Sequence, residues 1–198
     1  MDNYLYEYDG KLYINLTNEC SNDCAFCVRN TSDGVGGYFL WLKKPPTADE
    51  IIKKLEETDL GKYREFVFCG FGEPLCAFSE LVKVGEFLRA QGKRVRLNTN
   101  GQARLIVGDN AAERLKNAVD TVSISLNAPD AKKYNAVCRC AFGDDGYYAM
   151  LEFAKQCVKC VDRVILSVVD TIPQEDIEAC RKIAENMGAE FRVRKYEA

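Results

Sequence analysis

The stretch Cys20-Ser-Asn-Asp-Cys24-Ala-Phe-Cys27 is the most informative part of this sequence, because it places three thiols within eight residues. The stretch follows the apolar run 12–16, which is predicted to be a strand, so the cysteines are expected on a loop. A loop can fold three thiolates around one metal centre, whereas successive side chains of a strand point to opposite faces. The pattern therefore predicts a metal centre.

The nearest cysteine beyond this stretch is Cys69, on another predicted strand. A closed structural zinc site uses four ligands, and a ferredoxin-type run supplies a further cysteine close by. Three thiolates on a four-iron cluster leave one iron open to a small ligand. The spacing thus favours an iron–sulfur cluster, and a structural zinc site completed by a distant cysteine is the alternative.

The composition is that of an ordinary globular protein and predicts one domain over residues 1–198. Hydrophobic residues make up 47% of the chain and charged residues 29%, with a net charge of -3 at pH 7. No basic run indicates a nucleic-acid partner, and no apolar stretch reaches the roughly 20 residues that cross a bilayer. The N-terminal residues are polar, whereas a secretion segment would be apolar. We therefore expect a cytoplasmic protein.

The chain contains ten cysteines and no histidine. A reducing compartment argues against a disulfide framework, and the lack of histidine removes imidazole as a metal ligand or general base. Soft thiolate sites favour iron–sulfur clusters, zinc or copper(I). The pairs Cys138/Cys140 and Cys157/Cys160 allow two interpretations, an auxiliary cluster or buried thiols without a metal.

Short β-branched and aromatic runs alternate with longer amphipathic stretches. Strands are predicted over residues 12–16, 66–69, 95–97, 122–126, 164–169 and 191–193, and helices over 48–58, 78–90, 111–118, 130–136, 147–160 and 173–188. This alternation implies a parallel sheet with helices outside, and right-handed crossovers curl it. Six units are fewer than the eight of a closed barrel. The predicted fold is an α/β open, partial TIM-type (β/α)6 barrel.

The residues suited to chemistry follow the predicted strands, where parallel sheets carry their active sites. Residues 20–27 follow the first strand, 70–74 the second and 98–101 the third. Asn127 follows the fourth strand and Asp170 the fifth. We expect all of them on one rim of the barrel.

Cys20, Cys24, Phe26 and Cys27 resemble the cluster signature of the radical S-adenosylmethionine (SAM) superfamily, three cysteines spaced by three and then two residues with an aromatic residue before the last. The resemblance covers nearly the whole chain and implies a partial barrel of six β/α units. It implies two cofactors, a [4Fe–4S] cluster on the three cysteines and SAM on the open iron. Reductive cleavage of SAM would give a 5′-deoxyadenosyl radical that abstracts hydrogen from a substrate.

The resemblance also assigns residues to SAM. Gly70-Phe71-Gly72-Glu73-Pro74 is similar to the family's Gly-Gly-Glu-Pro motif, with Phe71 where the second glycine usually stands. A backbone carbonyl and Glu73 are expected near the methionine ammonium, and Arg139 is proposed for the methionine carboxylate. The full set of expected SAM contacts is Phe26, Gly70, Gly72, Glu73, Asn98, Thr99, Ser125, Asn127, Arg139 and Val169.

The segments 15–18, 68–74 and 125–129 most resemble the small radical SAM subgroup associated with TatD-type hydrolases. This resemblance implies an enzyme with a small-molecule or protein substrate, an electron donor such as flavodoxin or ferredoxin, and a TatD-type hydrolase as a partner. Two alternatives stay open. One is an activase that generates a radical on a partner protein, and the other is a non-catalytic protein that binds a cluster or zinc.

Overall fold

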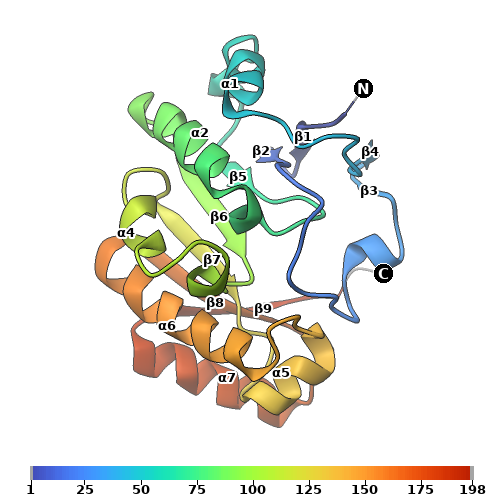
Figure 1. Cartoon of the computed structure of the whole chain (residues 1–198), viewed down its shortest axis with the longest axis vertical. Coiled ribbons are helices and arrows are strands. Elements are labelled where there is room, and N and C mark those ends of the chain that lie inside the picture. The colour runs from blue at the N-terminus through green and yellow to red at the C-terminus, as the bar shows by residue number, and fades with distance from the viewer. Residues whose placement is uncertain (1, 197–198) are drawn as a thin grey trace.

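The computed structural model describes residues 2–196 and contains a seven-stranded sheet in the order β1-β2-β5-β6-β7-β8-β9 (Figure 1). From β2 onward, neighbouring strands are parallel. The sheet begins at β1 and ends at β9, so it is open. The predicted open, partial barrel of six β/α units is confirmed. The parallel strands are β2 (Lys11–Ile14), β5 (Phe66–Phe68), β6 (Val95–Thr99), β7 (Thr121–Ser125), β8 (Arg163–Val169) and β9 (Glu190–Arg194).

The main helices lie along the outer face of the sheet, as the arrangement in Figure 1 shows. Short 3-10 turns at Val28–Asn30, Leu60–Lys62 and Pro74–Ala77 connect the remaining segments. The α-helices are α1 (Ala48–Glu56), α2 (Phe78–Ala90), α3 (Ala103–Ile106), α4 (Ala111–Leu115), α5 (Ala131–Cys138), α6 (Asp144–Cys160) and α7 (Gln174–Met187).

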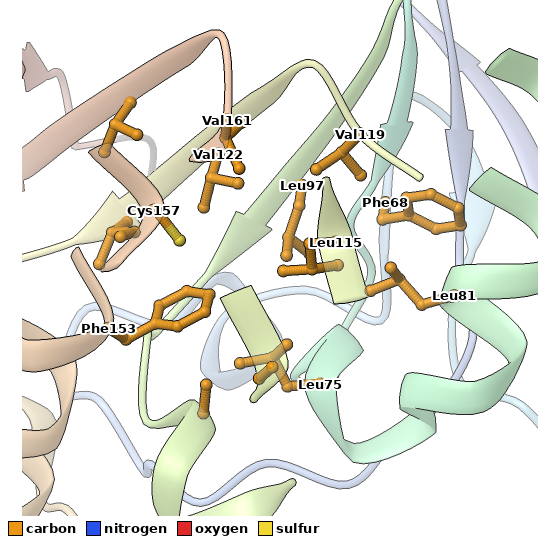
Figure 2. Packing of buried hydrophobic residues seen from close by; sticks show 14 of the residues in the cluster. Phe68, Leu75, Leu81, Leu97, Leu115, Val119, Val122, Phe153, Cys157 and Val161 are labelled. Carbon is orange, nitrogen blue, oxygen red and sulfur yellow. The ribbon is translucent and has the colours of Figure 1, made fainter. Parts of the chain in front are cut away.

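The core lies between the sheet and these helices. Phe68 and Leu97 from the sheet pack with Leu81 from α2, Leu115 from α4 and Phe153 from α6 (Figure 2), and all five side chains are buried. Because strand side chains alternate, the residues between these apolar positions point to the opposite, inner face of the sheet. That inner face carries polar side chains, and the loops at the carboxyl ends of the strands border it.

Two hairpins in the first 39 residues were not predicted. Strand β1 (Leu5–Tyr8) pairs antiparallel with β2, and β3 (Gly34–Val35) pairs with β4 (Tyr38–Phe39). The turn between β1 and β2 is Asp9-Gly10, with φ of 50° and 66°. Both values suit the two-residue turn that joins twisted strands. Asp-Gly was thus the available signal, and it follows a run rich in tyrosine.

Several predicted boundaries also shift. The first parallel strand ends at Ile14 rather than at residue 16, and α6 begins at Asp144 rather than at residue 147. Asp144 and Asp145 occupy the first turn of α6, where acidic side chains are favoured by the helix dipole. Helix α3 was not predicted at all. Among residues 2–196, no helix has the length and apolar character needed to span a membrane.

Candidate functional site

Cys20, Cys24 and Cys27 lie on the loop that follows β2, and all three are half-buried. This loop, residues 19–27, is called the cysteine loop below. Its backbone is tied to the end of α5, because the Asp23 amide donates to the Cys138 carbonyl at 3.0 Å and the Ala25 amide to that of residue 137 at 2.9 Å. The three thiols therefore lie on a loop, as predicted.

A buried side-chain network anchors the same loop to β6. Gln102, which is 0% exposed, donates through Nε2 to Asn22 Oδ1 at 2.8 Å and to the Tyr134 hydroxyl at 2.9 Å. Its Oε1 accepts from the Ser21 hydroxyl at 2.6 Å, and Asn22 donates to the Tyr134 hydroxyl at 3.0 Å. Sequence reasoning missed this network, since a buried glutamine after a strand has no motif.

The thiols occupy surroundings that disfavour their charged forms. Burial raises the pKa of Cys20 to about 12 and also raises the pKa of Cys27. A hydrogen bond with Cys138, together with burial, raises the pKa of Cys24. The Arg29 guanidinium acts in the opposite direction and lowers the pKa of all three thiols. A bound cationic metal centre would add to the effect of Arg29 and hold the sulfurs as thiolates.

The potential metal ligands that the motif supplies on the cysteine loop are the three thiols of Cys20, Cys24 and Cys27, which are soft donors. Thiolates are the ligands that iron–sulfur clusters use. The residues of the cysteine loop therefore fit a [4Fe–4S] cluster held by three cysteines.

The Gly70–Pro74 turn follows β5 and packs directly on the cysteine loop. A side chain at Gly72 would collide with the backbone carbonyls of Thr17 and Glu19. The Glu73 amide donates to that Glu19 carbonyl at 2.7 Å. Glycine is thus required at residue 72 by the close approach of two loops.

Glu73 is buried and links this turn to the end of β6. Its carboxylate accepts from the Thr99 hydroxyl at 2.7 Å, from the Asn100 amide at 2.7 Å and from the Leu75 amide at 3.0 Å. Burial raises the pKa of Glu73 to about 7, against the lowering effect of these hydrogen bonds. The structure therefore brings two predicted SAM contacts, Glu73 and Thr99, into direct contact with each other.

Asn98 lies on the inner face of the sheet, paired in register with residue 123 of β7. Its side chain hydrogen-bonds the Cys69 thiol and lowers the pKa of that thiol, although burial raises it more. Phe26 is half-buried and packs against the main core. Val169 is buried at the end of β8, in register with Arg194 of β9.

Ser125 is the last residue of β7, and Asn127 follows the strand with a φ of 57°. What joins them is a residue that sequence reasoning missed, Arg194. Its Nη2 donates to Ser125 Oγ and to Asn127 Oδ1, each at 3.4 Å. The signal available was weak, because Arg194 belongs to an alternating Arg-Val-Arg run that reads as an ordinary edge strand.

Arg139 lies beside the cysteine loop. It follows α5 in a left-handed conformation with φ of 47°, and its Nη1 is 3.4 Å from the Asp23 carboxylate. Its side chain is 57% exposed, so in this structure its charge is partly matched by an acidic residue of the cysteine loop and partly solvated.

The remaining cysteine pairs occupy two separate places. Cys138 and Cys140 border the cysteine loop, and Cys140 forms a β-bridge with Asn22. Cys157 and Cys160 end α6, whose other end lies beside Cys140. The intervening helix spans about 20 Å at 1.5 Å per residue. The two pairs are therefore too far apart to share one auxiliary cluster.

Comparison with known proteins identifies the family of the sequence and structures that share its fold. A profile of the radical SAM superfamily matches residues 14–187. The structure resembles Streptococcus suis SuiB bound to S-adenosylmethionine, with a TM-score of 0.65 and 16% identity over 93% of this chain and 38% of SuiB. It also resembles a radical SAM methyltransferase from Sphaerobacter thermophilus, with a TM-score of 0.63 and 15% identity over 96% of this chain and 68% of that one.

A third similar structure is the radical S-adenosylmethionine methyltransferase TsrM from Kitasatospora setae, with cobalamin and a [4Fe–4S] cluster bound. Its TM-score is 0.62 and its identity 13%, over 91% of this chain and 34% of TsrM. The chain thus spans about two fifths of SuiB and one third of TsrM. No curated protein sequence matches it. At such identities the structural likeness concerns the fold, whereas the profile match covers most of the sequence, and on that match the chain belongs to the radical SAM superfamily.

Proposed function

We propose that this protein is a radical SAM enzyme that cleaves S-adenosylmethionine reductively and uses the resulting radical on a substrate. The observation that carries the proposal is the cysteine loop. It presents three thiols at the carboxyl end of β2 and is fixed by hydrogen bonds to two neighbouring rim segments. A [4Fe–4S] cluster with SAM on its open iron would supply the chemistry, a one-electron cleavage that yields a 5′-deoxyadenosyl radical.

Cys20, Cys24 and Cys27 are the residues that would hold the cluster. Arg29 favours the thiolate form of all three, since it lowers the pKa of each thiol. The hydrogen bonds of Gln102 and the packing at Gly72 keep the loop in place. In this proposal the protein orients the reacting groups and leaves bond cleavage to the cofactors.

The expected SAM contacts form three groups along the rim. The turn with Gly70, Gly72 and Glu73 would face the methionine ammonium, with Asn98 and Thr99 next to it. Ser125, Asn127 and Val169 would border the ribose and adenine. Phe26 from the cysteine loop and Arg139 from the end of α5 would flank the methionine moiety. Exposed carbonyls and polar side chains of these kinds supply the acceptors and donors that SAM requires.

The substrate and the partners form the finer part of the proposal. We place the chain in the subgroup associated with TatD-type hydrolases, with a small molecule as the first candidate substrate. A flavodoxin or ferredoxin would deliver the electron, and a TatD-type hydrolase would be the functional partner. The resemblance of the segments 15–18, 68–74 and 125–129 to that subgroup supports this assignment.

Anaerobic reconstitution with iron and sulfide tests the proposal. The expected result is a four-iron absorption and resonance spectrum and, after reduction with dithionite, release of methionine and 5′-deoxyadenosine from SAM. Deuterium transfer into 5′-deoxyadenosine from candidate metabolites then identifies the substrate. A protein with full iron content that releases neither product after reduction contradicts the proposal.

Single cysteine variants separate cluster ligands from core thiols. Cys24→Ala is expected to lose the four-iron spectrum and SAM cleavage. Cys160→Ala is the matched control, because this thiol is half-buried at the far end of α6 and donates to the Ala112 carbonyl. Retention of full cleavage by the Cys24→Ala protein would remove Cys24 from the ligand set.

A further inference from the structure

An arginine lies on the inner face of the barrel, away from the cysteine loop in sequence. Arg194 is near the end of β9, and its guanidinium reaches past β8 to β7. There Nη2 donates to Ser125 Oγ and Asn127 Oδ1 at 3.4 Å each. Strand β8 separates β7 from β9 in the sheet, so the side chain must extend over the inner surface to make these contacts.

Within the described part of the chain, the charge of Arg194 is not matched by a carboxylate. Among residues 2–196, no Asp or Glu oxygen lies within 4.0 Å of its guanidinium. Its Nε is buried and has no hydrogen-bond partner in the same range. Burial lowers the pKa of Arg194, and the positive charge of Arg192 on the same strand acts in the same direction, whereas the thiols of Cys69, Cys24 and Cys138 act against it.

Arg96 of the same sheet shows how the protein treats an arginine with a structural role. Arg96 is 9% exposed, and its Nη2 lies 3.2 Å from the Glu65 carboxylate. The Nε of Arg96 also lacks a hydrogen-bond partner among residues 2–196, so the two arginines differ in the carboxylate and not in this atom. Arg194 is half-buried, and a charge partly withdrawn from water without such a partner is costly. A hydroxyl and an amide oxygen orient a guanidinium but leave its charge uncompensated. Arg194 thus has the surroundings of a ligand-binding group rather than of a structural ion pair.

We propose that Arg194, held by Ser125 and Asn127, binds an oxyanion group of a molecule inside the barrel, a carboxylate or a phosphate. The guanidinium matches the geometry of both groups and presents its remaining N–H donors to them. The inference rests on the proposed function, which places SAM and its substrate at this face. Either the methionine carboxylate of SAM or an acidic group of the substrate supplies the oxyanion.

The first test measures whether anion binding depends on Arg194. The unfolding temperature of the reconstituted protein is compared in inorganic phosphate, in malonate and in chloride of equal ionic strength. A ligand that binds only the folded state raises this temperature. Phosphate or malonate is expected to raise the unfolding temperature of the wild type more than that of Arg194→Gln. The increase for Arg194→Lys should lie between the two, because lysine keeps the charge but not the planar donor pair.

The same experiment excludes a merely structural role. Arg194→Gln is expected to unfold in chloride at the wild-type temperature or above it, since it removes a half-buried charge that has no carboxylate partner. Arg181→Gln is the control, because Arg181 lies on α7 and pairs with Glu178 at 3.2 Å. This control should keep the full response to phosphate and malonate.

The second arm identifies the source of the oxyanion. The affinities of SAM and of decarboxylated SAM are measured by calorimetry on the wild type and on Arg194→Gln. A loss of roughly tenfold or more for SAM but not for its decarboxylated analogue assigns Arg194 to the methionine carboxylate. Unchanged SAM affinity, together with a lost phosphate or malonate response, assigns it to the substrate.

Equal responses of wild type and Arg194→Gln to phosphate, malonate and SAM overturn the inference. So does a lower unfolding temperature of Arg194→Gln in chloride with those responses unchanged, since it makes Arg194 a structural link between β9 and β7. The comparison in phosphate and malonate requires no turnover, so its result is valid whether or not the wild type cleaves SAM. Failure of SAM cleavage alone counts against the proposed function and leaves the anion site standing.

Discussion

Single side chains, rather than the backbone alone, hold the rim of this barrel together. Glu73 joins the turn after β5 to the end of β6, and Gln102 joins the segment after β6 to the cysteine loop. Both residues are buried and accept or donate several hydrogen bonds. Loss of one such group leaves its former partners buried without hydrogen bonds, which costs more than the bond itself.

Glu73 gives the stability of the protein a dependence on pH. Its pKa is about 7 in the fold and 4.5 in the reference state, so the unfolded chain ionises first as the pH rises. The associated stabilisation is complete below pH 4.5 and lost as the pH rises to about 7. Glu73→Gln, which does not titrate, is therefore expected to gain about 3 kcal/mol over the wild type across that interval.

Urea unfolding at a series of pH values measures this difference. Glu185→Gln, at an exposed position of α7, is the control and should follow the wild type. A difference between Glu73→Gln and the wild type that stays constant with pH would show that the carboxyl titrates normally in the fold.

Gln102 is expected to stabilise the cysteine loop through its four side-chain partners, Ser21, Asn22, Tyr134 and Cys140. Gln102→Met keeps the volume but removes the donor to Asn22 Oδ1 and the acceptor of the Ser21 hydroxyl, and should lower the free energy of unfolding by about 2 to 4 kcal/mol. The iron content after reconstitution should fall with it. Gln174→Met, which loses one exposed bond to Glu178, should leave both values unchanged. Normal iron content in Gln102→Met would show that the loop forms without this anchor.

At the scale of elements, the site depends on loops that touch one another more than on the strands that carry them. The turn after β5 packs on the cysteine loop through Gly72, and the end of α5 hydrogen-bonds to its backbone. These contacts join segments that are far apart in the sequence. The helices behind the sheet contribute a rigid support, since their buried faces fill one core.

Gly72→Ala tests the close approach of the two loops. The new methyl group would meet the carbonyls of Thr17 and Glu19, which are backbone atoms and have little room to move. We expect a loss of about 1 to 3 kcal/mol in unfolding free energy and a weaker four-iron spectrum. Gly61→Ala is the control, because its nearest neighbour is the flexible Asp59 side chain. Full iron content in Gly72→Ala would show that the loops separate without consequence.

At the scale of the whole molecule, cluster binding should stabilise the fold. The cysteine loop draws together the ends of β2, β6 and α5, so a group bound there couples both halves of the sheet. A ligand that binds the folded state alone raises the unfolding temperature. The reconstituted protein is therefore expected to unfold at a higher temperature than the protein treated with a chelator, under anaerobic conditions.

The cluster dependence of this difference is checked with the cysteine variants. Cys24→Ala should unfold at the same temperature with and without reconstitution, and Cys160→Ala should keep the wild-type difference. If the unfolding temperature of the wild type is the same with and without the chelator, a cluster bound to the cysteine loop adds nothing to global stability.

Much of the fold was predictable because the signals are local. The open barrel was predicted from the apolar strand runs, from the helical spacing in residues 78–90 and from a count of six β/α units instead of the eight of a closed barrel. Helix α2 has the predicted bounds of residues 78–90. The β1–β2 hairpin was missed although Asp9-Gly10 marks its turn, because the tyrosine-rich run before it was not weighed as a strand. The short helix α3 was missed because four residues are too few for a periodic pattern.

The three-cysteine loop, the superfamily resemblance and the succession of six parallel strands can be predicted from the amino-acid sequence, since spacing and alternation are properties of neighbouring residues. The tertiary fold is what lets Gln102 anchor the cysteine loop and brings Glu73 to Thr99. It also brought Arg194 to Ser125 and Asn127, a meeting of residues nearly 70 positions apart. Such contacts depend on how three strands lie side by side, and no short stretch of sequence encodes that placement.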